Sequence, residues 1–219
     1  MKIAILVAMG MEAAKLTARI EGALPENRAG KKFLCGKIGQ AEVVLHQCGW
    51  GMRNAEKGTR ALVDNYRPDL IVNYGVSGGL VPEIGLAETV IALSSFPASG
   101  RRYVGGGAEA TDEKLARFAA QLLPHAQLAK ISTSLGIIFN KRRKTRVAQK
   151  SGAVCIDMET YTAAKTANEL GVPLLVIRCL SDTYEPASLL MFFKHGEIAA
   201  EKVAADTERV IKALAEDNP

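Results

Sequence analysis

The sequence predicts a three-layer α/β/α sandwich around a mixed, largely parallel β-sheet. Short, continuous apolar runs alternate with segments of helical spacing along the whole chain, which is typical of parallel strands buried on both faces. Two apolar runs flank Gly39-Gln40, a turn that indicates a hairpin and therefore some antiparallel pairing. With 219 residues, no linker and no repeat, the chain is expected to form a single domain over residues 1–219.

In the first half of the chain, apolar runs without helical periodicity predict strands. Stretches with apolar residues three and four positions apart predict helices. The expected strands cover residues 3–8, 33–38, 42–48 and 70–74, and the expected helices cover residues 12–21 and 53–65.

The second half continues this alternation and adds residues that suit helix ends. Thr111 precedes acidic residues at the start of a predicted helix, Asn140 precedes a basic helix, and Gly171 fits the end of a third. The run after Pro173 is the most apolar and predicts a buried strand. The expected strands cover residues 89–93, 127–133, 154–156 and 173–180, and the expected helices cover 112–122, 140–150, 158–170 and 197–215.

Composition narrows the class of protein. None of the four cysteines forms a CxxC pair and the three histidines are scattered, so we expect free thiols, no metal site and no cofactor. The apolar start is too short for a signal peptide, and no apolar run approaches the ~20 residues of a membrane span. We therefore expect a cytoplasmic protein that does not bind membranes.

A basic run between Lys141 and Arg146 supplies much of the formal net charge of +5. Aromatic residues, on which single-strand binders stack bases, do not interleave with it. We interpret the run as a solvated helix face and expect no nucleic-acid partner. The alternative, a nucleic-acid binder, predicts binding that weakens steeply with salt.

Polar residues and glycines follow four of the predicted strands. In chain order they are Glu12, the loop Gly75–Gly79, Asp157 with Glu159, and Asp182 with Arg178 just inside its strand. Ligands of such sheets bind beyond the carboxyl ends of the strands, so we expect these residues to form one site. Neighbouring carboxylates push their pKa values apart, which allows one to serve as an acid and another as a base. Helix capping remains an alternative role for Asp157, and ion pairing one for Arg178.

Three longer segments carry a family resemblance. They are the start MKIAILVAMGMEAAKL, the middle CGWGMRNAEKGTRALVDNYRPDLIVNYGVSGGL and the end CIDMETYTAAKTANELGVPLLVIRCLSDT. In the last one an acidic-Met-Glu triplet precedes a helix and a Pro-led apolar strand that ends in R-x-x-S-D. With these segments the chain resembles the nucleoside phosphorylase/nucleosidase superfamily, most of all its methylthioadenosine/S-adenosylhomocysteine nucleosidase branch. The resemblance implies a small purine nucleoside as substrate and cleavage of its N-glycosidic bond.

The resemblance also implies roles for single residues. Asp182 matches the acid that protonates or hydrogen-bonds purine N7, and Glu159 matches the carboxylate that holds the ribose hydroxyls. Glu12 matches the acid that activates water, Arg178 an arginine near that water, and Met158 the residue under the sugar. These types suit a reaction in which positive charge grows on the sugar and negative charge on the base.

Two other segments complete the implied site. Phe139 is the best candidate to stack on the base, and Val76, Ser77 and Gly78 are expected to contact the substrate. Here the sequence departs from the family pattern G-S-A-G-G, because Val76 replaces a hydroxyl that would touch the nucleophile. The triplet usually reads E-M-E rather than D-M-E, and Trp50 stands where a small aliphatic residue is common.

These departures leave room for a bulky or apolar 5′ group. An apolar cluster could line it: Leu189, Leu190, Met191, Phe192 and Phe193. The plainer interpretation of that cluster is a helix core or a subunit interface. The alternative substrate is a large adenosine derivative such as the adenosylhopane handled by a hopanoid-associated branch.

Water and phosphate compete as the nucleophile. Phosphorylases of the superfamily carry a glycine-aspartate-proline-type loop near the N-terminus, whereas this chain has Met9-Gly10-Met11-Glu12. Glu12 would repel phosphate, so water is favoured, although Arg53 would change this if it reached the site. A phosphorylase and a non-catalytic nucleoside-binding protein remain the alternatives. Relatives form dimers or larger assemblies, so a homo-oligomer is expected, with Trp50 and Tyr103 as exposed apolar candidates.

Overall fold

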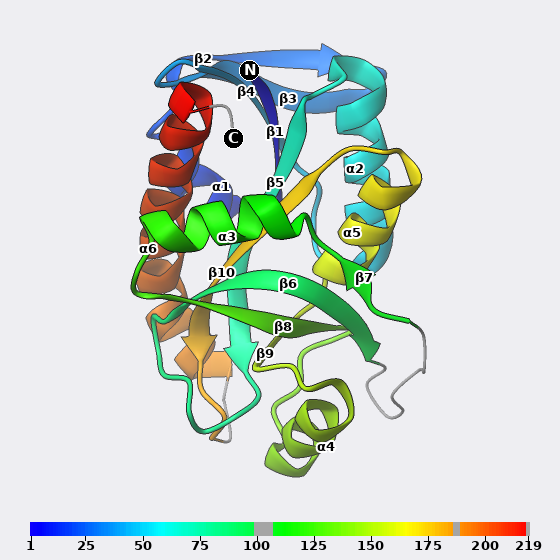
Figure 1. Ribbon diagram of the computed structural model, residues 1–219, viewed down its shortest axis with the longest axis vertical. Helices are drawn as coiled ribbons and strands as arrows, with labels where there is room; N and C mark the ends of the chain where they lie inside the picture. Colours follow the sequence, from blue (N-terminus) through cyan, green and yellow to red (C-terminus); the bar gives the residue numbers. More distant parts are fainter. Residues whose placement is uncertain (99–106, 186–188, 218–219) are drawn as a thin grey trace.

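The computed structural model describes residues 1–98, 107–185 and 189–217. It is an α/β sandwich with a mixed central sheet between two layers of helices, as the sequence predicts (Figure 1). The described strands are β1 (Lys2–Val7), β2 (Glu21–Arg28), β3 (Lys31–Ile38), β4 (Ala41–Gln47), β5 (Leu70–Gly79), β6 (Thr89–Ala98), β7 (Glu109–Ala110), β8 (Ala126–Ser134), β9 (Cys155–Asp157) and β10 (Leu174–Asp182). The described helices are α1 (Gly10–Thr17), α2 (Met52–Tyr66), α3 (Glu113–Leu122), α4 (Lys141–Ser151), α5 (Thr160–Glu169) and α6 (Leu189–Asp217).

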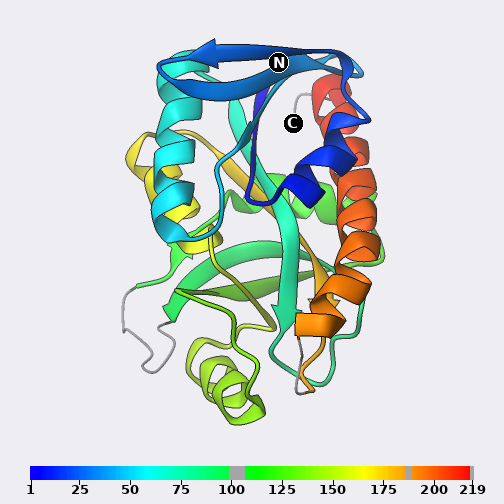
Figure 2. The same ribbon diagram turned by 180° about the vertical axis from the view of Figure 1, so that it is seen from behind.

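The sheet is buried on both faces, which explains its continuous apolar strands. In β1, Ile3 and Ile5 join the core under α1, α3 and α6, whereas Ala4 and Leu6 join the core under α2 and α5. Side chains of a strand alternate between faces, so a strand with helices on both sides has to be apolar at every position. Figure 2 shows α1 beside α6 at one side of the molecule and α2 at the other.

Five strands close into a small barrel at one end of the sheet. β5 pairs with β9 and β10, β10 pairs with β6, β6 pairs with β8, and β8 pairs with β9. The pairings of β5 with β10 and of β8 with β9 are parallel, whereas those of β5 with β9 and β6 with β10 are antiparallel. This closure brings the ends of β5, β9 and β10, on which the predicted site residues lie, to one place.

The expected helix over residues 12–21 is too long. α1 ends at Thr17, and the chain then forms β2, an edge strand that the sequence analysis missed. Its residues are mostly exposed on both faces, so it has no apolar periodicity, and Pro25 is tolerated because an edge strand has unpaired N–H positions. β2 and β3 join through Ala29-Gly30, both with positive φ, as a tight hairpin requires.

Other element ends differ in smaller ways. β5 continues through the glycine-rich segment to Gly79 instead of ending at residue 74. Asp112, not Thr111, caps α3, since its carboxylate accepts the Leu115 N–H while the Thr111 hydroxyl bonds the carbonyl of Ala92. The Asn140 cap of α4 and the hairpin turn with positive φ at Gly39 are confirmed.

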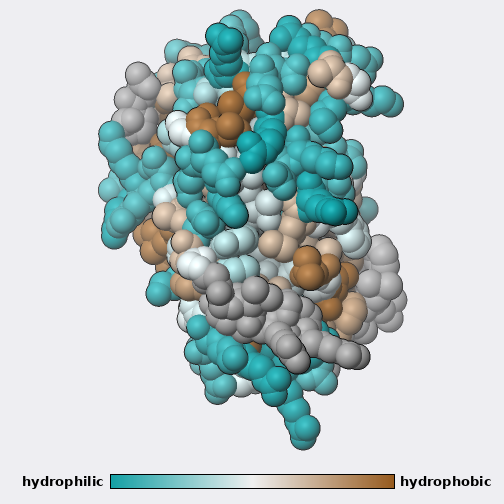
Figure 3. Space-filling view, turned by 90° about the vertical axis from the view of Figure 1, so that its right-hand side faces the viewer, coloured by the Kyte–Doolittle hydropathy of each residue, from teal (hydrophilic) through white to brown (hydrophobic). Residues whose placement is uncertain are grey.

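The surface that carries α2 and α5 is mainly hydrophilic, with a few apolar patches (Figure 3). Among the described residues, none of the helices combines the length and the apolar character that a membrane crossing needs.

Candidate active site

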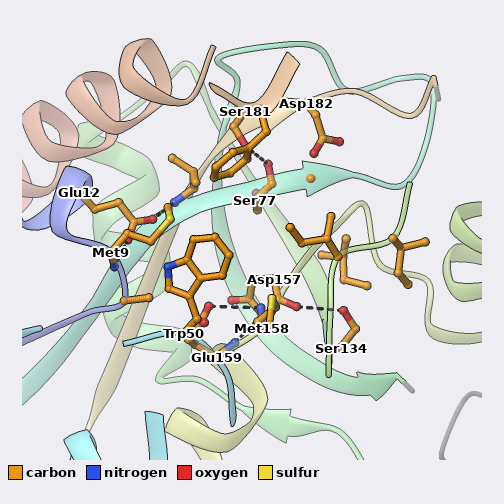
Figure 4. Close-up of a pocket in the computed structure, with 17 residues that line it drawn as sticks. Met9, Glu12, Trp50, Ser77, Ser134, Asp157, Met158, Glu159, Ser181 and Asp182 are labelled. Atoms are coloured by element: carbon orange, nitrogen blue, oxygen red, sulfur yellow. Dashed lines mark hydrogen bonds between the residues drawn. The ribbon is translucent and has the colours of Figure 1, made fainter. Parts of the chain in front are cut away.

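A pocket opens where β5, β9 and β10 end. It encloses about 620 Å³ of free space, counting its open mouth. Its lining combines carboxylates and hydroxyls with apolar side chains: Ala8, Met9, Glu12, Trp50, Val76, Ser77, Gly78, Ser134, Ile137, Ile138, Ile156, Asp157, Met158, Glu159, Ser181, Asp182 and Phe192. Figure 4 shows Glu12 and Asp182 at opposite sides of this space, with Glu159 between them and lower in the view.

Glu12 lies at the first turn of α1, with its carboxylate directed toward β5. Oε2 accepts the backbone N–H of Met9 at 2.8 Å and Oε1 accepts that of Val76 at 2.8 Å. Burial raises the pKa of Glu12 above its usual range, while these two N–H donors and the guanidinium of Arg178 lower it. Gly75 makes the approach possible, because a Cβ there would lie 2.6 Å from Oε1. The result is a buried, fixed carboxylate whose basicity suits proton transfer from water.

Glu159 stands at the N-terminus of α5. Its Oε1 accepts the N–H of Gly51 at 2.7 Å and its Oε2 that of Met158 at 3.2 Å. Gly51 has a φ of 93°, a backbone conformation that glycine adopts without strain. Burial, followed by repulsion from Asp157, raises the pKa of Glu159 to about 7. Each oxygen of the carboxylate has two acceptor sites, so both can accept a further donor such as a sugar hydroxyl.

Asp182 ends β10 at the far side of the pocket. Its Oδ1 accepts a hydrogen bond from Lys144 Nζ at 2.8 Å, in an ion pair that is almost completely buried. Gly78 permits this position, because a Cβ there would lie 3.0 Å from Oδ2. Burial raises the pKa of Asp182, while the ammonium of Lys144 and the N–H of Gly79 lower it.

A second buried ion pair lies beneath the pocket. Arg178 Nε bonds Asp157 Oδ2 at 2.9 Å, and its other N–H groups bond the backbone of Asn73 and Ile177 and the side chains of Asn73 and Thr160. Asp157 also accepts the Thr160 N–H, so it caps α5 and pairs with Arg178 at once. The guanidinium therefore has its donors occupied by the protein and acts on the pocket through its charge.

Comparisons with known proteins identify the family of the chain. Residues 2–213 match the family model described as the phosphorylase superfamily. A curated 5′-methylthioadenosine/S-adenosylhomocysteine nucleosidase from Geobacillus kaustophilus is 31% identical, over 93% of this chain and 94% of the relative. The chain belongs to the phosphorylase superfamily. The resemblance that the sequence analysis stated is thereby confirmed.

Solved structures share the fold of this chain. An S-adenosylhomocysteine nucleosidase from Streptococcus pyogenes superposes with a TM-score of 0.91 at 21% identity, covering 98% of this chain and 97% of that one. A futalosine hydrolase mutant from Helicobacter pylori superposes with a TM-score of 0.90 at 19% identity, covering 97% and 99%. The same fold thus accompanies enzymes named for different nucleosides.

Within this family fold, most of the predicted site residues come together. Glu12, Glu159 and Asp182 line the pocket, as do Met158 and the segment Val76–Gly78. The Ser77 side chain is buried, and the Val76 backbone N–H, not a side-chain hydroxyl, contacts Glu12.

Two predicted residues lie outside the pocket lining, and so does Arg53, whose reach the sequence left open. Arg178 is beneath the pocket, so direct contact with a nucleophile is not supported by its position. Phe139 is 37% exposed and does not line the pocket, whereas Ile137 and Ile138 of the same loop do. Arg53 is exposed on α2 and also outside the lining. In the apolar cluster after Asp182, Phe192 lines the pocket, and the other four side chains, like Tyr103, lie outside the described part of the chain.

Sequence reasoning missed Lys144 as a site residue. The basic run is mostly exposed, as expected, but Lys144 is fully buried. Lys144 shares its buried helix face with Val147 and Ser151, three and seven positions further on, and this helical spacing was visible in the sequence. The described residues contain no cluster of His, Cys, Asp and Glu side chains arranged to hold a metal ion.

Proposed function

We propose that this protein is a purine nucleosidase, which cleaves the N-glycosidic bond of an adenosine-type nucleoside with water. The observation that carries the proposal is the placement of Glu12, Glu159 and Asp182 around one pocket. In chemical terms the pocket offers a base, a group that grips hydroxyls and an acid, each fixed by backbone or side-chain hydrogen bonds.

The reaction assigns one step to each group. As the C1′–N9 bond breaks, its electron pair moves to the purine and positive charge develops on the ribose. Asp182 donates a proton to N7 of the departing base. Glu159 accepts hydrogen bonds from the ribose hydroxyls, and Glu12 takes a proton from the water that attacks C1′. Acid and base assistance of this kind is worth about 10²–10⁴-fold in rate for each group.

The geometry of Glu12 favours water over phosphate. Two backbone N–H groups that could bind an anion, those of Met9 and Val76, already donate to the Glu12 carboxylate. A phosphate at this place would lose those donors and face a negative charge. The matched relatives are named methylthioadenosine/S-adenosylhomocysteine nucleosidases, and these names are consistent with water as the nucleophile.

The mouth of the pocket suits an apolar 5′ group. The rings of Trp50 and Phe192 meet edge to face with centroids 6.5 Å apart, and Met9 also lines the space. We therefore assign thioether-substituted adenosines as the substrate class, and the room beside Trp50 extends this to larger apolar substituents.

We further propose a homo-oligomer in the cytoplasm. Trp50 and three side chains of the loop that precedes α4, Leu135, Ile137 and Phe139, are between 37% and 71% exposed. Burying such side chains against a second copy of the chain removes apolar surface from water. Four free thiols are consistent with a reducing compartment. Analytical ultracentrifugation tests the assembly, and a monomer at micromolar concentration contradicts it.

A panel of nucleosides with and without phosphate tests the activity. Adenosine, methylthioadenosine and S-adenosylhomocysteine are incubated with the protein, and free adenine is measured by chromatography. We expect adenine from the 5′-thioether substrates at a rate that phosphate does not raise. Phosphate-dependent release would indicate a phosphorylase, and binding without release would indicate a nucleoside-binding protein.

A further inference from the structure

Lys144 is an unusual residue for its position. It belongs to the basic helix α4, yet its side chain is completely buried while most charged neighbours on that helix face solvent. A buried ammonium is strongly unfavourable unless it is paired and hydrogen-bonded. Lys144 meets this condition with two acceptors, Asp182 Oδ1 at 2.8 Å and the carbonyl of Thr183 at 2.6 Å. Asp182 is the last residue of β10 and lines the pocket, and Thr183 follows it directly.

Two further interactions hold α4 against the same segment. Lys141 Nζ bonds Glu185 Oε1 at 2.7 Å, and the hydroxyls of Thr145 and Tyr184 are 2.7 Å apart. The helix is therefore attached to the chain that follows Asp182 on either side of Lys144. This attachment fixes the ammonium relative to the carboxylate.

The ion pair between Lys144 and Asp182 defines the orientation of the Asp182 carboxyl group. Lys144 engages Oδ1, so Oδ2 is the oxygen that can serve a purine in the pocket. Gly78, on the neighbouring strand β5, has no side chain to displace either oxygen. The ammonium thus engages one oxygen of Asp182 and leaves the other without a contact to Lys144.

We propose that Lys144 is a positioning residue for Asp182, which orients this acid and stabilises the carboxylate left after its proton has passed to the leaving purine. The inference rests on the proposed function. In the step, the N9–C1′ electron pair goes to the base, N7 takes the proton from Asp182, and the new carboxylate lies beside the ammonium. Glu12 receives the proton of the attacking water, so charge and atoms balance without any further reactant.

The charges around Asp182 support this role. Lys144 on α4 is the charged group that lowers the pKa of Asp182 in the described structure, β5 contributes the Gly79 N–H, and burial acts in the opposite direction. The other pocket carboxylates, Glu12, Asp157 and Glu159, lie apart from Asp182 in Figure 4. Removing the ammonium should therefore raise the pKa of Asp182.

The first test is kinetic. We expect Lys144→Met to lower kcat about 10–100-fold and to move the alkaline limb of kcat/KM to higher pH, because a weaker acid keeps its proton longer. Lys144→Arg keeps the positive charge and should keep the limb near its original pH. Arg146→Met, at an exposed position of the same helix, is the matched control and should change neither quantity. An unshifted limb with unchanged kcat in Lys144→Met would overturn the proposal.

The second test needs no substrate. The carboxyl carbon of Asp182 can be titrated by ¹³C NMR in the wild type, Lys144→Met and Lys144→Gln, with Asp182→Asn to assign the signal. Higher Asp182 pKa values in both Lys144 variants are expected, and an unchanged value contradicts the pairing. Because this readout is independent of turnover, an inactive wild type would refute the proposed function while the ion pair is still tested. If Lys144→Met does not fold, the pKa of Asp182 in Lys144→Gln provides the test.

Discussion

Glu12 Oε1 accepts the backbone N–H of Val76 at 2.8 Å, across the gap between α1 and β5. The contact places the carboxylate over Gly75, the one residue type that leaves room for it. It also explains how the site can lack a side-chain hydroxyl at position 76, since the backbone supplies the donor.

Glu12→Gln is expected to lower kcat about 10²–10⁴-fold, because an amide cannot accept a proton from water. Gly75→Ala replaces no titratable group but should have a similar effect. Its Cβ would lie 2.6 Å from Glu12 Oε1 and would displace that carboxylate. Gly107→Ala is the control, because a Cβ there meets no atom within 4 Å. Steady-state rates of adenine release measure all three. Full activity in Gly75→Ala would show that the position of Glu12 is unimportant.

Asp182→Asn is expected to reduce kcat by about 10²–10⁴-fold while the nucleoside still binds, because the amide fills the same space but donates no acidic proton. Asp206→Asn is a suitable control. Asp206 is also a buried carboxylate, paired with His125 and Thr89 outside the pocket. Equal losses in both variants would mean that general destabilisation, not acid chemistry, causes the effect.

Glu159 should make the protein less stable as the pH rises. The folded protein holds its proton up to a pKa of about 7, whereas the unfolded chain loses it near the usual 4.5. The folded state thus binds more protons between these values, so the free energy of unfolding falls as the pH rises through this window. Glu159→Gln, which can keep the Gly51 hydrogen bond, is expected to gain roughly 1–2 kcal/mol at pH 8 and little at pH 4. Urea unfolding at both pH values measures it.

The same residue links stability to binding. Ribose hydroxyls need an acceptor, so KM should rise as the pH falls through about 7, where Glu159 becomes protonated. In Glu159→Gln this dependence should disappear and KM should be high at every pH. A KM independent of pH in the wild type would argue against the assigned role.

Trp50→Ala should change specificity more than chemistry. Trp50 lines the pocket and contacts the ring of Phe192, so its removal takes apolar surface from the proposed 5′ subsite. We expect kcat/KM to fall about tenfold for adenosines with long 5′-alkylthio groups and little for adenosine itself. Losses of equal size for both substrates would place Trp50 outside the subsite.

The convergence of the candidate site residues on one pocket could be predicted because it follows from the fold. Glu12 and Glu159 lie a few residues after the ends of β1 and β9, and Asp182 ends β10. The carboxyl ends of parallel strands meet at one edge of a sheet. The sequence could not show that β5, β9 and β10 also close into a barrel, since this depends on pairings between distant segments.

The position of Arg178, the burial of Lys144 and the strand β2 could not be predicted, each for a different physical reason. The role of Arg178 depends on whether a long side chain turns toward the pocket or beneath it, and the buried partners Asn73 and Asp157 direct it beneath. Lys144 was overlooked because it stands among basic residues that are mostly exposed. The composition of a segment does not show which of its residues lie on the buried face of the helix. The edge strand β2 was missed because its exposed residues carry no apolar pattern.

The most direct measurement of the central claim follows the oxygen that arrives at C1′. The protein is incubated with methylthioadenosine in ¹⁸O-water with phosphate present, and the sugar product is analysed by mass spectrometry. If Glu12 activates water while Asp182 protonates the leaving purine, the product is free methylthioribose that carries one ¹⁸O atom. Formation of methylthioribose 1-phosphate, or no cleavage of any adenosine derivative, would contradict the account.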